Sequence, residues 1–302
     1  MLSALCTSAT FAQSPNTGRI AGTLTDPNGA RIVGAQVTIT SDATAEQRRV
    51  TSDDQGNYSA PLLSPGTYVV RIAARGFAPA LFARVPVIIT ETTTADAEMV
   101  PAGPDTVSID IDSLIHSDGP QLGRVVDTRT VSGLPLATRN FTQILALSPG
   151  ASVTLADNTA LGRNSQNVSV NGARVTQNNF ELNGIDANYI ANNAAAFWAV
   201  PAPETIQEFR VQTSLYDASF GRGGGGNIQA VTRSGSNDFH GAGYEYFRND
   251  ALNANNPFLK AAGVKRPTLE RNVFGGMFGG PLKKDRSFFF VSYQGARERN
   301  GA

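Results

Sequence analysis

Short runs of alternating hydrophobic and polar residues fill the first hundred positions of the chain. In the stretch RIAGTLTD, Ile20 and Leu24 fall on one face of an extended strand, and in PGTYVVRIAARGF, Tyr68 and Ile72 do the same. Turn sequences separate these runs, for example DPNGA, where proline fixes one backbone dihedral and Asn-Gly accepts a positive φ. Several short strands at this spacing predict a β-sandwich over residues 18–100.

The connector that follows, residues 101–119, is polar apart from the piece DTVSIDID. Val107, Ile109 and Ile111 alternate there with polar residues. Taken alone, this alternation predicts one more edge strand of the sandwich. Its functional interpretation depends on the domain that comes after it.

Residues 120–236 mix helical and strand patterns. Phe141, Ile144, Leu145 and Leu147 recur at helical spacing, and Pro-Gly ends that helix. Strands separated by Asn-Gly turns follow in NVSVNGARVTQNNFELNGIDAN, and a short proline-initiated helix leads into a strand in PAPETIQEFRVQTS. A G-x-G-x-x-G pattern in the glycine run GRGGGGN precedes a strand pattern rather than a helix, so no nucleotide site is predicted.

Glycine and aromatic residues alternate in residues 237–302. Two sets of residues lie on common faces of the predicted strands: Ala242, Tyr244 and Tyr246, and then Phe289, Val291 and Tyr293. The short charged turn KKDR suits two adjacent antiparallel strands. This pattern is typical of membrane-spanning barrel strands, and it predicts that both aromatic faces lie toward the lipid interface. The alternative is a sandwich strand packed by aromatic residues in water.

Composition excludes several classes of function. Twenty-five basic and twenty-five acidic residues leave no net charge, so no nucleic-acid partner is predicted. One cysteine, Cys6, excludes disulfide frameworks and cysteine-based metal sites. The two histidines, His116 and His240, form no H-x-x-x-H pair, and no G-x-S-x-G elbow occurs. Neither a cofactor nor an enzyme activity is predicted.

The first residues, MLSALCTSATFAQS, are mildly apolar and end in small residues. This pattern predicts a secretory signal peptide over residues 1–13 with cleavage near Ala12, although the usual basic residue at the front is missing. A lipoprotein with Cys6 acylated is disfavoured, because Leu5 stands where a small residue is expected. No run of about 18 apolar residues predicts a transmembrane helix.

The predicted sandwich resembles the carboxypeptidase regulatory-like domain, a transthyretin-like fold grouped with carbohydrate-binding-like folds. The residues that carry the resemblance are Gly22, Asp26, Gly29, Gly34, Ala35, Val37, Thr51, Asp53, Gly56, Tyr58, Pro65, Gly66, Tyr68, Gly76 and Phe77. The resemblance implies a fold and no peptidase activity, because the zinc ligands of the peptidase are missing from these positions.

The rest of the chain resembles the TonB-dependent outer-membrane receptors, specifically the Oar-like group. A plug signature is carried by Asn171, Gly172, Arg174, Asn183, Gly184 and Asp186. A junction between plug and barrel is carried by Gly235, His240, Gly241, Arg248 and Asn249. The family often has aspartate where this chain has Asn183, a departure that leaves the turn intact. The resemblance continues into RNVFGGMFGGPLKKDRSFFFVSYQGARE.

This resemblance implies a mainly β chain: a sandwich in the periplasm, an α/β plug over residues 120–236, and the first strands of a transmembrane β-barrel over residues 237–302. It implies an outer-membrane location and import of a substrate (siderophore, oligosaccharide or peptide) with inner-membrane energy delivered by the TonB protein. TonB pairs with a segment of pattern Asp-Thr-apolar-x-apolar, which is matched here by Asp105, Thr106, Val107, Ser108 and Ile109.

Residues 237–302 provide about three strands, whereas the smallest membrane barrels need about eight. The sequence is therefore expected to be the amino-terminal part of a longer receptor. Two other functions stay open at this point. One is a secreted binding or adhesion protein whose sandwich is a carbohydrate-binding-like module, and the other is a regulatory module of a secreted hydrolase.

Overall fold

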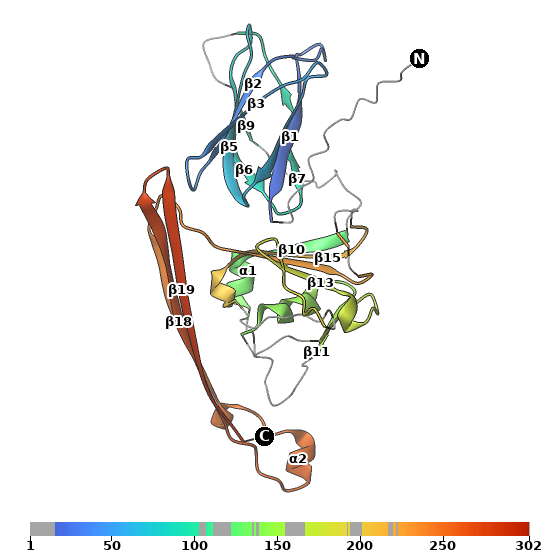
Figure 1. The fold of residues 1–302 in the computed structure, drawn as a ribbon, viewed down its shortest axis with the longest axis vertical. Coiled ribbons are helices and arrows are strands. Elements are labelled where there is room, and N and C mark those ends of the chain that lie inside the picture. The colour runs from blue at the N-terminus through green and yellow to red at the C-terminus, as the bar shows by residue number, and fades with distance from the viewer. Residues whose placement is uncertain are drawn as a thin grey trace.

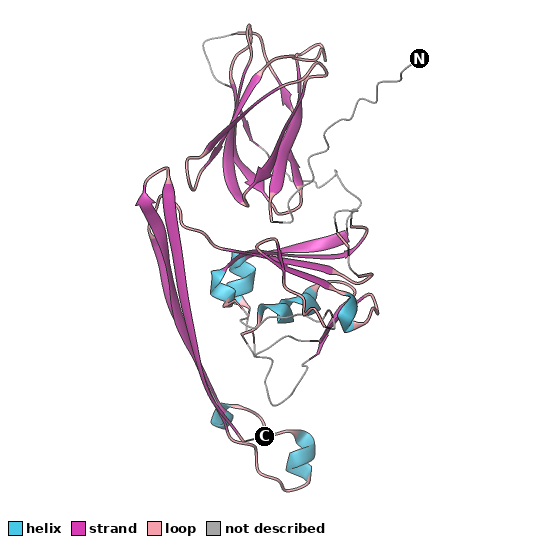
Figure 2. Ribbon diagram, viewed as in Figure 1, coloured by secondary structure: helices cyan, strands magenta, loops and turns pink. Residues whose placement is uncertain are grey.

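The computed structural model has three parts: a sandwich, a plug-like α/β domain, and a long three-stranded ribbon that runs beside the second part (Figure 1). It describes residues 16–102, 107–110, 122–134, 136, 139–154, 167–191, 193, 201–216, 220–221 and 223–301. The predicted signal peptide over residues 1–13 therefore lies outside the described residues, as do Asp105 and Thr106. Strands dominate all three parts, and the few helices are short (Figure 2).

The first part is a β-sandwich of two sheets. One sheet has the order β4-β1-β7, with β8 also pairing with β1, and the other has the order β3-β2-β5-β6-β9. The bounds are β1 (Gly18–Thr25), β2 (Gln36–Ser41), β3 (Gln47–Thr51), β4 (Asn57–Leu63), β5 (Gly66–Ala73), β6 (Ala80–Val87), β7 (Thr92–Thr94), β8 (Ala97–Glu98) and β9 (Val107–Asp110).

Alternation along these strands builds the sandwich core. Ile20 and Leu24 on β1 and Val70 and Ile72 on β5 are fully buried between the two sheets, as the period-two pattern predicts. Tyr58 is also buried, and its hydroxyl donates a 2.6 Å hydrogen bond to the carbonyl of Ala95. Burial raises the pKa of this phenol far above its usual range, so it acts as a neutral donor.

The second part is a mixed sheet with short helices on one side. The strand order is β10-β15-β16-β13-β14, and a separate hairpin pairs β11 with β12. The bounds are β10 (Leu122–Asp127), α1 (Thr128–Gly133), η1 (Phe141–Leu147), β11 (Ala151–Thr154), β12 (Asn167–Val170), η2 (Val175–Gln177), β13 (Asn179–Leu182), β14 (Ile185–Asp186), η3 (Pro203–Thr205), β15 (Ile206–Ser214) and β16 (Asn227–Thr232).

The predicted helix around Phe141 is present as the 3₁₀ helix η1. Asn140 caps it, since its side-chain oxygen accepts the backbone N–H of Thr142. Phe141, Ile144 and Leu145 enter the core of this domain, but Leu147 is half exposed. Leu147 is the last residue of η1, and the winding of the helix does not explain its exposure.

The third part is an antiparallel ribbon in the order β17-β18-β19. Its strands are β17 (His240–Asn249), β18 (Leu269–Lys283) and β19 (Ser287–Asn300), and the loop between the first two contains η4 (Asp250–Leu252) and α2 (Pro257–Ala261). No helix among the described residues is long and apolar enough to cross a membrane.

The two faces of the ribbon have different surroundings. Tyr246 donates a hydrogen bond to Glu204 of the plug, so the face of β17 with Ala242, Tyr244 and Tyr246 lies toward the plug. The prediction that this tyrosine face meets lipid is therefore wrong. Alternation shows which residues share a face but not which side that face occupies, and a phenol hydroxyl is stabilised where it finds a polar partner.

The opposite face of the ribbon is apolar and aromatic near the β18–β19 turn, whereas Glu245, Asn272 and Arg297 lie on it farther from that turn. Phe278 stacks on Phe239 with ring centroids 5.8 Å apart and contacts Phe289 at 5.7 Å. Val291 and Tyr293 are 58% and 67% exposed on the same side, away from the plug. This outer face agrees with the predicted lipid-facing set on β19.

Candidate functional site

A buried ionic cluster joins the plug to the ribbon. Arg139, just before η1, forms an ion pair with Glu204 of η3, and both side chains are less than a tenth exposed. The hydroxyl of Tyr246 on β17 donates a 2.6 Å hydrogen bond to the same Glu204 oxygen, and the guanidinium of Arg139 lies 3.8 Å from the centre of the Tyr246 ring. We call these three residues the plug–wall cluster.

Backbone geometry places the two charged members of the plug–wall cluster. Arg139 has a φ of 55°, in the left-handed region that a non-glycine residue rarely adopts, and Pro203 initiates the turn that contains Glu204. Each charge is compensated, because the guanidinium meets both a carboxylate and an aromatic face. Nearby, burial lowers the pKa of the Arg233 guanidinium, and the Glu204 carboxylate opposes that shift.

A second buried cluster joins the sandwich to the plug. Glu208 of β15 accepts the backbone N–H of Ile89 at 3.1 Å. Arg210 donates to the carbonyl of Ile89 at 2.5 Å and to the hydroxyl of Thr90, and it forms a 2.9 Å ion pair with Glu91. We call these five residues the sandwich–plug cluster. Burial raises the pKa of Glu208 to about 7; Glu91 adds to this rise, whereas the Ile89 N–H and Arg210 oppose it.

The plug-signature residues form turns at the edges of the plug domain. Asn171 and Gly172 both have positive φ, as do Asn183 and Gly184 at the β13–β14 turn. The amide nitrogen of Asn183 donates to the hydroxyl of Thr232 at 3.1 Å, and its oxygen accepts the Thr232 N–H at 2.9 Å. The Asn183 side chain therefore supplies both a donor and an acceptor to Thr232.

The other two signature residues also have local roles. The backbone N–H of Arg174 donates to the side chain of Gln177 at the start of η2, and an oxygen of Asp186 accepts the N–H of Asn188. The signature therefore shapes turns and does not form a single cluster with shared ligands.

The junction residues lie along the ribbon and are also structural. A Cβ on Gly235 would lie 2.3 Å from the carbonyl of Phe289, and one on Gly241 would lie 2.7 Å from that of Met277. His240 stacks on Phe290, and Asn249 caps η4. Arg248 is half-buried, on the same face of β17 as Tyr246.

The candidate TonB-pairing segment is partly described. Val107, Ser108 and Ile109 belong to β9, which pairs in parallel with β6 of the sandwich. This pairing agrees with the prediction, made from the alternation alone, that these residues form one more edge strand of the sandwich. The structure does not bring these three described residues together with the plug signature or the junction.

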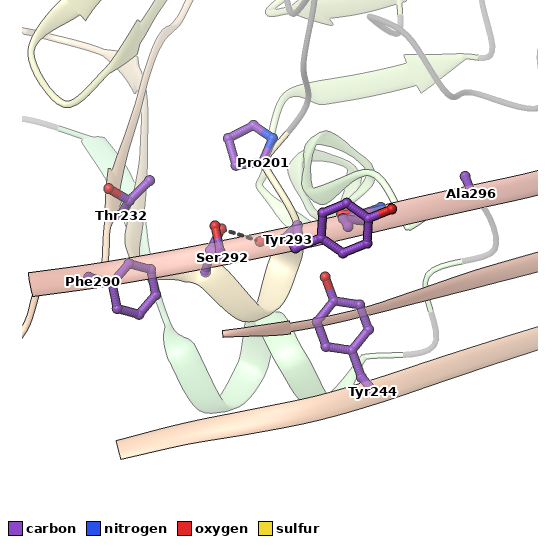
Figure 3. Close-up of a pocket in the computed structure, with 10 residues that line it drawn as sticks. Pro201, Thr232, Tyr244, Phe290, Ser292, Tyr293 and Ala296 are labelled. Carbon is purple, nitrogen blue, oxygen red and sulfur yellow. Dashed lines mark hydrogen bonds between the residues drawn. The ribbon is translucent and has the colours of Figure 1, made fainter. Parts of the chain in front are cut away.

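A cavity of about 490 Å³ lies between the plug and the inner face of the ribbon (Figure 3). Pro201 and Thr232 line it from the plug side, and Tyr244, Ser292 and Ala296 line it from the ribbon. In the part of the chain that the structure describes, no group of three or more His, Cys, Asp or Glu residues is placed to hold a metal ion.

Neither ionic cluster is predicted by the sequence. Their members are far apart in the chain, 65 residues for Arg139 and Glu204 and 119 for Ile89 and Glu208. One signal was present: Glu208, Arg210 and Gln212 alternate with buried apolar residues on β15, which indicates a strand whose polar face is covered as well.

Three family models match successive parts of the chain. The carboxypeptidase regulatory-like domain matches residues 19–100, the TonB-dependent receptor plug domain matches residues 119–228, and the outer membrane beta barrel domain matches residues 231–302. These matches confirm the predicted fold class and the order of its parts.

The TonB-dependent transporter Oar of Myxococcus xanthus is 28% identical over 305 residues, which is 95% of this chain and 27% of that protein, so the chain spans about a quarter of this relative. The siderophore receptor PirA from Acinetobacter baumannii aligns with 60% of this chain and 25% of that chain, at 18% identity and a TM-score of 0.41. The transporter YddB from Escherichia coli aligns with 59% of this chain and 26% of that chain, at 17% identity and 0.45.

At these TM-scores the two structural alignments carry no functional argument. The identification depends on the family models and on the Myxococcus relative. Three domain matches in this order, together with a relative that aligns over nearly the whole chain, identify the chain as a member of the TonB-dependent receptors of the outer membrane.

Proposed function

We propose that this chain supplies the periplasmic sandwich, the plug and the first wall strands of a receptor that imports a substrate when TonB pulls on residues 105–109. The observation that carries the proposal is the plug–wall cluster. Arg139 and Glu204 hold the plug against the inner face of β17 through Tyr246, which is the arrangement of a stopper inside a barrel wall.

The ends of the ribbon support the sidedness. The turn between β18 and β19 is short and lies on the sandwich side, whereas the longer loop with η4 and α2 lies at the far end (Figure 1). Asn237 bonds to the β18–β19 turn through Asp285, and its N–H donates to the carbonyl of Ala43 in the sandwich at 2.8 Å. Membrane barrels have short periplasmic turns and longer outer loops, so the sandwich belongs in the periplasm.

The plug sheet suggests a route for the pull. The segment 105–109 leads along the chain to β10, which ends the order β10-β15-β16-β13-β14. Its register pairs β10 with β15 alone among the described strands. Tension from TonB therefore acts on an edge strand, which can separate from the sheet by breaking one ladder of hydrogen bonds rather than two.

The secreted carbohydrate-binding alternative gains no support from the sandwich surface. All four aromatic residues between positions 18 and 100 face inward: Tyr58, Tyr68 and Phe82 are buried and Phe77 is half-buried. A sugar-binding surface needs exposed aromatic rings on which a sugar can stack. The proposed role includes no catalytic step. Siderophores, oligosaccharides and peptides are the substrate classes to screen.

The proposal is tested at Val107. In the complete receptor, Val107→Pro removes one backbone donor and fixes φ, so strand pairing with TonB should be lost and substrate uptake should fall at least tenfold. Val107→Ala is the matched control, since it keeps the backbone donor, and uptake should stay within about twofold of the parent. Unchanged uptake in the Val107→Pro receptor would overturn the assignment.

A further inference from the structure

The cavity between the plug and the ribbon has a neutral lining (Figure 3). Ten described residues line its volume of about 490 Å³, and none of them carries a charge. This volume lies within the range of small-molecule sites, about 300–1,000 Å³. Aromatic rings, hydroxyl groups and one amide take the place of charges, among them Tyr244, Phe290, Ser292 and Gln294. Such a lining offers hydrogen bonds and ring faces to a ligand but no counter-ion.

The Tyr244 hydroxyl is an unused hydrogen-bonding group of this cavity. It is buried, and it has no hydrogen-bond partner in the part of the chain that the structure describes. Tyr244 lies opposite Gly275 on β18, and a Cβ on Gly275 would come within 2.5 Å of that hydroxyl. Glycine therefore leaves the space that the phenol ring occupies. A buried hydroxyl without a partner costs free energy, which a ligand that bonds to it would recover.

Two more neutral side chains lie beside Tyr244 on the inner face of the ribbon. Gln294 of β19 is directly opposite Gly275, which is in turn opposite Tyr244, so the ring and the amide share one row across the three strands. Ser292 lies on the same face, two residues earlier in β19. Both side chains are exposed and line the cavity. A ligand in the cavity can therefore contact the Tyr244 ring, the amide and the hydroxyl together.

The charged residues next to the lining in the sequence are compensated within the chain. Glu204 precedes Thr205 and forms an ion pair with Arg139 in the plug–wall cluster. Arg233 follows Thr232, and the Glu204 carboxylate favours its charged form. An anionic ligand, such as an anionic ferric siderophore, would find no cation in the described lining. Burial of its charge there would be costly.

The lining also favours a sugar over a peptide. An extended peptide is recognised by the backbone groups along an exposed strand edge. The ribbon meets the cavity with the side chains of its inner face, and the backbone of its middle strand, β18, is paired on both edges. Aromatic rings suit the apolar face of a sugar ring, and hydroxyl and amide side chains both donate and accept hydrogen bonds, as sugar hydroxyls require.

We propose that this cavity is a binding subsite for a neutral oligosaccharide during import, in which Tyr244 stacks on one sugar ring and hydrogen-bonds to the sugar, with Ser292 and Gln294 as further hydrogen-bonding partners. This inference rests on the function proposed above. It selects one of the three substrate classes named there.

The test measures binding of defined probes to the 302-residue chain in detergent. The neutral probes are maltotetraose, cellotetraose, xylotetraose and mannotetraose, and the others are an anionic ferric catecholate siderophore and tetra-alanine. Saturation-transfer NMR detects weak binding and gives the dissociation constants. At least one tetrasaccharide should bind, whereas the siderophore and the peptide should not. If no tetrasaccharide binds, the proposal is overturned, whichever other probe binds.

Tyr244→Phe tests the contact itself. It keeps the ring and removes only a hydroxyl that has no partner among the described residues, so the fold should be retained. Loss of one hydrogen bond to the sugar should weaken binding about three- to tenfold. Phe247→Ala is the matched control, because it removes an exposed ring from the outer face of the same strand, and it should change binding less than twofold. Equal affinity of the Tyr244→Phe chain and the parent would refute the contact.

These measurements need no TonB, which separates the subsite from the proposed function. The Val107→Pro chain should bind the tetrasaccharide as the parent does, since Val107 does not line the cavity. If a tetrasaccharide binds and Val107→Pro leaves uptake by the complete receptor unchanged, the TonB role is refuted and the subsite stands. If Val107→Pro abolishes uptake and no tetrasaccharide binds the chain, the subsite is refuted and the proposed function stands.

Discussion

Glu208 predicts a specific dependence of stability on pH. The residue is 8% exposed at the contact between plug and sandwich, and burial raises its pKa from 4.5 to about 7. The charged groups around it are Arg210 on its own strand and Glu91 in the sandwich. These two residues form an ion pair at 2.9 Å. Between pH 4.5 and 7 the folded state therefore binds more protons than the unfolded state, and stability falls as pH rises.

The size of this effect follows from the pKa shift. A shift of one unit corresponds to 1.36 kcal/mol, so a rise from 4.5 to about 7 contributes about 3 kcal/mol, fully present below pH 4.5 and lost above pH 7. Glu208→Gln removes the titration but keeps an oxygen that accepts the Ile89 N–H. Between pH 4.5 and 8, the unfolding free energy of the parent should therefore fall by about 3 kcal/mol more than that of the variant.

The assay is urea unfolding of the chain in detergent across that pH range, followed by the fluorescence of Trp198, the single tryptophan. Glu98→Gln is the control, because Glu98 is an exposed carboxylate of the sandwich, and its pH profile should match that of the parent. If Glu208→Gln and the parent show the same slope, then the carboxylate is solvated and the sandwich is not docked on β15 as the structure shows.

Two further predictions concern the ribbon. Tyr246→Phe keeps the ring beneath Arg139 but removes the donor to Glu204, so it should lower the unfolding free energy in detergent by about 1–3 kcal/mol; no loss would mean that the plug does not contact the wall there. Gly235→Ala places a Cβ 2.3 Å from the carbonyl of Phe289, so it should shift the junction and increase proteolysis near residue 235, and an unchanged cleavage pattern would contradict the close approach.

The sequence predicted most of the local structure. Alternation and Asn-Gly turns located strands of the sandwich, as Ile20 and Leu24 show, and the positive φ values at Asn171 and Asn183 agree with the predicted turns. It did not predict which face of β17 meets the plug, because a period of two is symmetric between the faces. The position of Tyr246 depends on Glu204, a residue from another element, and a strand pattern contains no information about such a partner.

The ionic clusters could not be predicted from the sequence either, because their members also depend on partners in other elements. Scattered charged residues are usually solvated, and Arg139, Glu204 and Glu208 have nothing in their neighbouring residues to distinguish them, apart from the alternation on β15. Their burial follows from packing of one domain on another. Such packing brings together positions that are more than sixty residues apart in the chain.

One short stretch of the plug contacts both neighbouring parts. Glu204 of η3 reaches the wall, and Glu208 and Arg210 of β15 reach the sandwich a few residues later. Both contacts use paired charges and hydrogen bonds in place of a shared apolar core. Replacing a buried ion pair by apolar groups is often neutral or stabilising. Such pairs therefore define how the plug is oriented against its neighbours more than they stabilise the contact. A plug held in this way has a defined resting position, yet it can move from the wall without exposing the hydrophobic residues that keep it folded.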